Sequence, residues 1–313
     1  MPNNSNIPTP ASPDVCTSVI LLDGVPLPGS YHVLSVNVTR ELNRIPVAVL
    51  NLRDGEASQS TFAASNSALF IPGKKIEIKL GYRSQNDSVF KGIIVRHSIK
   101  VRSSGSQLII ECRDEAVKMT SGIKSKYFID KKDSDIMDEL IGTYSLSKDI
   151  EATVPSLKEV VQYESTDWDF ILCRAEANGQ VVMVEDGKII VAKPATGGTS
   201  VVSVKFGTTL LELDAEIDAR IQSKGIEASS WNATDQEVIK AQASEPTSTN
   251  NGNLSASDLA KVIGGDALEI QHGGKLSTPE LQAWADGRLM KERLARVLGR
   301  ANFRVLLAFC QEK

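Results

Sequence analysis

The stretch FIPGKKIEIKLGY, residues 70–82, and the stretch VFKGIIV, residues 89–95, decide the kind of fold that this chain adopts. Pro72 and Gly73 supply the backbone angles of a chain reversal, and apolar and polar residues alternate from Ile76 onward. Alternation with a period of two is typical of a strand that buries one face. The two stretches therefore predict an antiparallel hairpin.

The same period of two runs through the first third of the chain. Between Thr17 and about Met119, several alternating runs are separated by Asp-Gly and Pro-Gly dipeptides that favour turns. Regularly spaced strands with such turns suggest a small antiparallel barrel. We predict a first β-barrel domain over residues 15–120, preceded by a disordered leader rich in Pro, Ser and Asn at residues 1–14.

The period changes after about Lys118. Apolar residues at helical spacing predict a short helix over 134–144, and Thr166 with Asp169 three positions later has the form of a capping box. The dipeptide Asp186-Gly187 lies between two apolar runs, which is a strong hairpin signal. We predict an α+β connecting region, with a helix and a hairpin, over residues 121–199.

Strand-like alternation returns after residue 200. We predict a second barrel-type domain over 200–313, with a polar, mobile loop at 242–257 and a helix that begins near Ser277 to Pro279. The predicted fold class is α+β, with two small antiparallel β-barrel domains joined by mixed α/β elements.

The amino-acid composition argues against several classes of protein. The chain has 313 residues, 41% of them hydrophobic, and a formal net charge of -4, so it lacks the basic field that gathers nucleic acid. No secretory signal begins the sequence, and no run approaches the roughly 18 apolar residues of a membrane helix, so we expect synthesis in the cytoplasm. Cys16, Cys112, Cys173 and Cys310 show no CxxC spacing, which argues against a disulfide framework.

Motifs for catalysis or cofactor binding are missing from the sequence. His32, His97 and His272 lie far apart, without a pattern of Cys or carboxylates around them. The glycine pairs at 197–198 and 264–265 lack the form of a phosphate-binding loop and predict turns. We therefore predict no catalytic, cofactor-binding or metal-binding residues.

One acidic cluster admits two interpretations. Glu164, Asp167, Asp169 and Glu176 could supply a carboxylate pair for glycoside hydrolysis. Alternatively, the first three lie where a helix N-terminus favours negative charge, and Glu176 is a solvated position near Arg174. Capping is the stronger interpretation, because catalytic carboxylates need a pocket that a sequence cannot show.

Three segments together resemble a known family. They are YESTDWDFILCRAEANG at 163–179, LSTPELQAWAD at 276–286, and LARV at 294–297 followed by Gly299 and Arg300. The order and separation of these segments and of the first hairpin resemble the hub half of the VgrG spike family of contractile injection machines. That group includes type VI secretion spikes, phage-tail hub proteins and extracellular injection particles. The resemblance extends from about Val15 to Phe303.

The resemblance implies a structural part rather than an enzyme. Hubs of this kind form a homotrimeric ring with pseudo-sixfold symmetry, which adapts a trimeric spike to a hexameric tube. Its partners would be the tube protein, baseplate proteins and effectors, and only the assembled machine would contact a target membrane. Two alternatives stay open: a hub with cell-wall hydrolase activity, and a stand-alone barrel that binds a carbohydrate or peptide as a monomer. The type of contractile machine also stays open.

The last ten residues depart from the family pattern. Family members continue with Gln-Gly and a later Pro-Gly strand, whereas this chain has RVLLAFCQEK at 304–313. These residues can be encoded by a reading shifted by one base from codons for a family-like tail. We therefore hypothesise a frameshift near codon 304, which would leave the second barrel incomplete.

Overall fold

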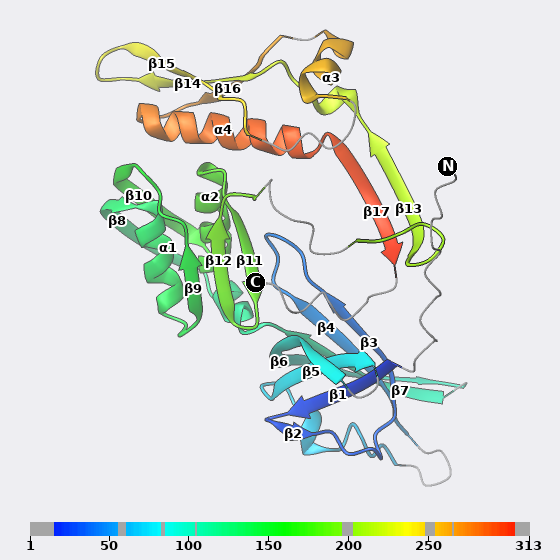
Figure 1. The fold of residues 1–313 in the computed structure, drawn as a ribbon. Coiled ribbons are helices and arrows are strands. Elements are labelled where there is room, and N and C mark those ends of the chain that lie inside the picture. The colour runs from blue at the N-terminus through cyan, green and yellow to red at the C-terminus, as the bar shows by residue number, and fades with distance from the viewer. Residues whose placement is uncertain are drawn as a thin grey trace, which may run out of the picture.

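A computed structural model describes residues 16–55, 61–82, 85–103, 105–195, 203–247, 254–264 and 266–303. These parts form an α+β fold that is rich in strands, with mostly antiparallel sheets and three separate hydrophobic cores. Figure 1 shows the first sheet at the bottom, a mixed α/β region above it, and a helix-backed sheet at the top.

The first sheet has seven antiparallel strands in the order β2-β1-β5-β6-β7-β4-β3. The predicted hairpin is confirmed: β5 pairs with β6, and Ile78 lies opposite Phe90 in the core. Phe70 and Leu50 are fully buried in the same core. The strands are β1 (Cys16–Leu22), β2 (Val25–Pro26), β3 (Val33–Thr39), β4 (Val47–Arg53), β5 (Lys75–Tyr82), β6 (Gln85–Arg102) and β7 (Gly105–Arg113), with the 3-10 helix η1 (Ala68–Phe70) before β5.

The prediction of closed barrels is wrong for the described residues. The first sheet ends in β2 and β3, which do not pair with each other, and β2 has only two residues. One of these is Pro26, which has no N–H to donate to a neighbouring strand. Beyond residue 200, the described strands form two small separate sheets instead of a second barrel.

The middle region packs two helices against small sheets. Its core includes Ile136, Met137, Trp168 and Ile171. The predicted turn at Asp186-Gly187 is confirmed, since both residues have positive φ, of 50° and 82°. The elements are η2 (Glu115–Thr120), β8 (Lys124–Lys132), α1 (Asp133–Gly142), β9 (Ser147–Ile150), β10 (Ser156–Ser165), α2 (Asp167–Ala177), β11 (Val181–Glu185) and β12 (Lys188–Ala192).

The last region divides into a helix-backed sheet and a two-stranded ribbon. Leu281, Ala285 and Leu289 of α4 pack on the sheet β15-β14-β16, while β13 and β17 pair only with each other. Figure 1 shows this ribbon running from the top region toward the first sheet. The elements are β13 (Leu210–Ile217), η3 (Ala219–Ile221), β14 (Ile226–Asn232), β15 (Glu237–Gln242), α3 (Ala256–Ile263), β16 (Leu268–His272), α4 (Thr278–Leu294) and β17 (Val297–Phe303).

The predicted start of α4 is confirmed, whereas the bounds of the predicted loop 242–257 need correction. Ser277 and Glu280 form a capping box at the start of α4. At the loop, Gln242 still belongs to β15, and α3 begins at Ala256 because Ser255 and Asp258 cap each other. The part of the loop at 248–253 lies outside the described residues.

Two further predictions concern the ends of the chain. The leader at 1–14 and the departing segment 304–313 both lie outside the described residues. In the described part, every helix is too short or too polar to cross a membrane.

Candidate assembly surface

The three histidines lie in separate parts of the fold. His97 Nδ1 lies 3.1 Å from the carbonyl oxygen of Phe70, and His272 Nδ1 lies 2.9 Å from the carbonyl oxygen of Gly274. His32 is exposed in the loop before β3. Across the described ranges, no group of three or more His, Cys, Asp or Glu residues is arranged to hold a metal ion.

The acidic cluster does not form one site. Asp169 is exposed, and its backbone N–H donates to the Thr166 hydroxyl at 3.1 Å, so the predicted cap of α2 is confirmed. Glu164 is also exposed, and its backbone N–H donates to Ser125 Oγ at 3.2 Å. The capping interpretation therefore accounts for the start of the helix, but Asp167 has a role that the sequence did not reveal.

Asp167 is a buried carboxylate at the centre of a hydrogen-bond network. Lys124 Nζ and Tyr144 Oη each donate to its Oδ2 at 2.6 Å, and Gln162 Nε2 donates to Oδ1 at 2.9 Å. Burial would raise the pKa of this carboxyl, but the three hydrogen bonds outweigh burial and hold the pKa below its ordinary value. The network joins β8, β10 and the chain after α1 to the start of α2, so it stabilises the fold.

Glu176 and Arg174 also have different partners from those expected. The Arg174 guanidinium makes a bidentate pair with the buried Asp133 carboxylate, at 2.5 and 2.8 Å, and Asn178 Nδ2 donates to the same carboxylate at 2.7 Å. Glu176 instead pairs with Lys291 of α4. Both contacts join distant segments, which local spacing along one helix cannot predict.

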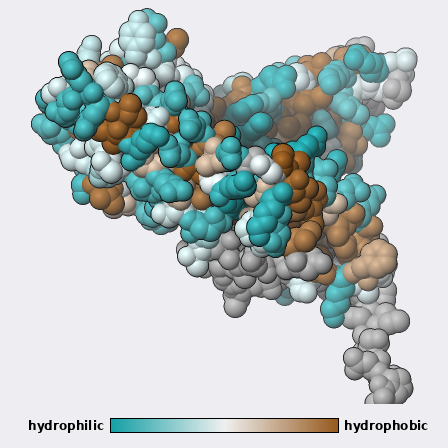
Figure 2. Space-filling model, turned by 90° about the horizontal axis from the view of Figure 1, so that it is seen from above, coloured by the Kyte–Doolittle hydropathy of each residue, from teal (hydrophilic) through white to brown (hydrophobic). Residues whose placement is uncertain are grey.

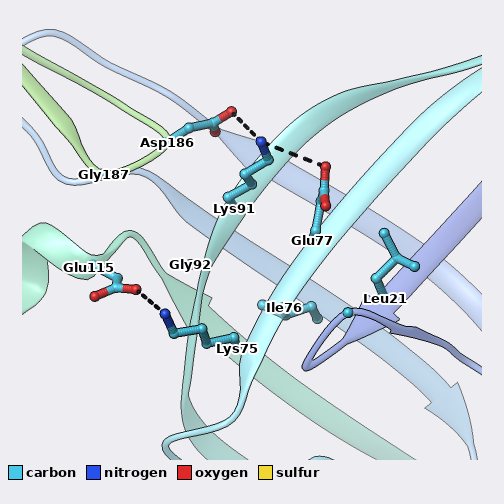
Figure 3. A pocket seen from close by; sticks show the side chains of 10 residues that line it. Leu21, Lys75, Ile76, Glu77, Lys91, Gly92, Glu115, Asp186 and Gly187 are labelled. Atoms are coloured by element: carbon cyan, nitrogen blue, oxygen red, sulfur yellow. Dashed lines mark ion pairs between the residues drawn. The ribbon is translucent and has the colours of Figure 1, made fainter. Parts of the chain in front are cut away.

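A hollow of about 290 Å³ lies where the turn between β11 and β12 meets the first sheet. Figure 3 shows its charged side chains: Lys91 lies 3.8 Å from Glu77 and 4.0 Å from Asp186, and Lys75 lies 3.5 Å from Glu115. Each cation therefore has an acidic neighbour within the hollow. This arrangement favours a junction between two parts of the chain over a site for a charged ligand.

Several hydrogen bonds join the first sheet and its flanking loops to the β11–β12 hairpin. Asp114 accepts from the backbone N–H of Gly187 at 2.9 Å, and Asn43 exchanges two hydrogen bonds with Val182, at 2.7 and 2.8 Å. Arg40 also pairs with Asp186 at 3.2 Å. Burial raises the pKa of Asp114 despite the N–H groups that it accepts. The turn at 186–187 therefore connects the β11–β12 hairpin firmly to the first sheet.

The ribbon β13–β17 exposes several large apolar side chains. Leu211, Leu213 and Ile217 are 51%, 59% and 52% exposed, and Val297 beside Ile217 is 45% exposed. Seen from above, Figure 2 shows a hydrophobic patch in the area where Figure 1 places this ribbon. A two-stranded ribbon has little independent stability in water. The exposed ribbon is therefore a candidate assembly surface.

The two faces of the ribbon differ in chemistry. Leu213 lies beside Ala301, and Ile217 beside Val297, on the apolar face. The neighbouring positions on β13 are acidic and point to the other face: Glu212, Asp214 and Glu216. The apolar alternation of this strand is visible in the sequence, whereas nothing in the sequence predicts a function for its acidic positions.

A family model described as the Alg8 N-terminal domain matches residues 12–306. The chain belongs to this family. The description of this family names no activity. The family is also not the VgrG family that the sequence resembles. No curated protein matches the sequence.

Several solved structures of tail and spike proteins are similar to this chain. The 43 kDa tail protein of prophage MuSo2 from Shewanella oneidensis is 12% identical, and the match covers 92% of this chain and 82% of that one with a TM-score of 0.62. A tail protein from Neisseria meningitidis MC58 is 13% identical, with coverages of 91% and 79% and a TM-score of 0.62. A chain of the Francisella PdpA-VgrG complex is 11% identical, with a TM-score of 0.50, and the match covers 85% of this chain and 42% of that one. At these identities the likeness shows a shared fold, so the resemblance to tail and spike proteins is confirmed at the level of fold.

Proposed function

We propose that this chain is a structural hub of a contractile injection machine. Three copies would form a ring that adapts a trimeric spike to a hexameric tube. The observation that carries this proposal is the fold shared with the MuSo2 tail protein over 92% of the chain. The division into regions 15–120, 121–199 and 200–313 is part of the proposal.

The proposed role is mechanical and includes no substrate turnover. The described acidic residues support this view, since Asp167 and Asp133 are buried among hydrogen-bond donors and Asp169 is next to a helix cap. The partners would be the tube protein, baseplate proteins and effectors, with no nucleic acid. The machine would be built in the cytoplasm and released as a particle, and only the whole machine would contact a target membrane.

A hub that transmits force needs firmly joined parts, and the described contacts supply them. Asp114 and Asn43 connect the first sheet to the β11–β12 hairpin. Glu176 and Lys291 then connect the middle region to α4. The Asp114 carboxylate is buried, and leaving it without its N–H donors would cost free energy, so this contact resists separation.

Incubation with the cognate hexameric tube protein tests this function. We expect the purified chain to co-sediment with tube hexamers and to increase the number of tubes counted by electron microscopy. A variant with Asp114→Ala, which loosens the junction, should bind less. A chain that neither co-sediments with the tube protein nor changes the number of tubes would contradict the proposal.

A further inference from the structure

The outer edge of β13 is free among the described residues. In that part of the chain the only strand that pairs with β13 is β17, and a single bridge joins Leu210 at its start to Phe206. Beyond Leu210, the other backbone edge of β13 has no described strand beside it. Leu211 and Leu213 point to one side of the strand, and Glu212, Asp214 and Glu216 point to the other. No ion pair joins these three carboxylates to another described residue. An edge of this kind is a template for a strand from another chain.

A second free edge lies at the far end of β6. This strand pairs with β5 only as far as Ile93, opposite Lys75, whereas its pairing with β7 continues to Arg102. Within the described structure, residues 98–102 therefore have a strand on one side only. Figure 1 shows that β13 and the β6–β7 hairpin belong to different regions of the molecule.

The end of β6 has the same alternation as β13, but with the opposite charge. Ile99 and Val101 are 44% and 57% exposed. Between and after them are Lys100 and Arg102, both exposed, and neither forms an ion pair with another described residue. Among the described residues, the Arg102 guanidinium donates to the neighbouring Val101 carbonyl oxygen alone, at 3.0 Å. The two cations are spaced two residues apart, as Glu212 and Asp214 are.

We propose that β13 of one copy lies alongside residues 98–102 of β6 in a second copy. The added strand would place Ile99 and Val101 next to Leu211 and Leu213, so that an apolar face too narrow to be stable alone becomes part of a wider sheet. On the other face, Lys100 and Arg102 would meet the carboxylates of β13, and opposite charges on neighbouring strands stabilise a sheet.

This contact uses two different surfaces of the same chain. A head-to-tail contact of that kind closes into a ring when the rotation between copies allows it. The inference therefore rests on the proposed homotrimer and assigns the strands that join its copies. Within one chain Arg300 of β17 lies opposite Asp214. The proposed contact would add Lys100 and Arg102 of a second copy as further partners for the acidic positions of β13.

Paired charge reversals test the contact. One variant carries Glu212→Lys and Asp214→Lys, a second carries Lys100→Glu and Arg102→Glu, and a third combines all four changes. Sedimentation equilibrium measures the concentration at which half of the chain is assembled. We expect each one-sided reversal to raise this concentration at least tenfold, and the combined variant to return it to within threefold of the wild-type value.

A matched control separates the contact from a general effect of charge. Lys132→Glu with Lys158→Glu changes the net charge by the same amount as the second variant, at exposed positions on β8 and β10. This control should assemble as the wild type does, and circular dichroism should show the same fold for all variants.

Three results would overturn the inference. If both one-sided variants assemble like the wild type, the strand contact is wrong while the hub proposal stands. If both fail and the combined variant does not recover, the two strands do not contact each other. A wild-type chain that stays monomeric, alone and with the tube protein, contradicts both the contact and the hub.

Discussion

Gly179 and Gly287 contact each other backbone to backbone where the end of α2 crosses α4. A Cβ atom added to Gly179 would lie 2.7 Å from the Gly287 Cα, and one added to Gly287 would lie 2.6 Å from the Gly179 Cα. Such distances are too short for a side chain on either residue, so both glycines are required for the helices to pack. Gly179 also has a φ of +67°, which ends α2 in the left-handed region.

Replacing Gly287 with alanine should therefore destabilise the fold. The added methyl group must push α4 away from α2, at a cost of about 1–3 kcal/mol, as for other overpacked sites. Urea unfolding followed by circular dichroism measures the loss. Gly225→Ala is the control, because a Cβ at Gly225 meets nothing within 4 Å. Equal stability of the two variants would show that the helices do not cross this closely.

The Asp167 network predicts a dependence of stability on pH. The pKa of Asp167 is lowered in the folded chain, so its contribution to stability is present above the ordinary value of 3.8 and is lost as the pH falls through the lowered pKa. Asp167→Asn should remove this contribution and cost about 1.5–3 kcal/mol at pH 7, the range for hydrogen bonds to a charged group. Thermal unfolding between pH 2 and 7 measures the difference, with exposed Asp169→Asn as the control. Parallel pH profiles for the wild type and Asp167→Asn would contradict the network.

The contribution of Asp114 to stability should change with pH in the opposite direction from that of Asp167. Burial raises the pKa of this carboxyl, so the stability of the fold falls as the pH rises from the ordinary value of 3.8 through the raised value. Asp114→Ala should still destabilise the chain at neutral pH, by about 1–3 kcal/mol, because the N–H groups of Ala116 and Gly187 lose their acceptor. Hydrogen exchange at Gly187 reports the effect directly. Unchanged protection of that N–H in the variant would count against the proposed junction.

The mechanical role predicts no turnover of cell-wall material. Purified peptidoglycan incubated with the chain should release no soluble fragments above a buffer control, because Asp167 is buried among its donors rather than open to a substrate. Release that disappears in both Asp167→Asn and Asp169→Asn would instead revive the hub with hydrolase activity.

Local features of the fold were predictable from the sequence. The hairpin after Gly73, the turn at Asp186-Gly187 and the caps at Thr166 and Ser277 depend on a few neighbouring residues, and all four are present. Such signals work because turn angles and cap hydrogen bonds are determined within about four residues.

Features that depend on distant residues were not predictable. The burial of Asp167 requires Lys124, which is 43 positions away, and the need for Gly179 depends on Gly287 in another region. Barrel closure depends on how the edge strands meet, and alternation in β3 or in the short β2 carries no information about that. The exposure of both faces of β13 depends on how the ribbon lies relative to the rest of the fold, so the sequence could not predict that its acidic positions are open to a partner.

The native mass of the purified chain, measured by light scattering over a range of concentrations, tests the hub account most directly. One chain has a mass of 33.8 kDa, so the account predicts a species of about 101 kDa, three times that value. A species that stays at the mass of one chain, both alone and in the presence of the tube protein, would contradict it and favour a stand-alone binding module.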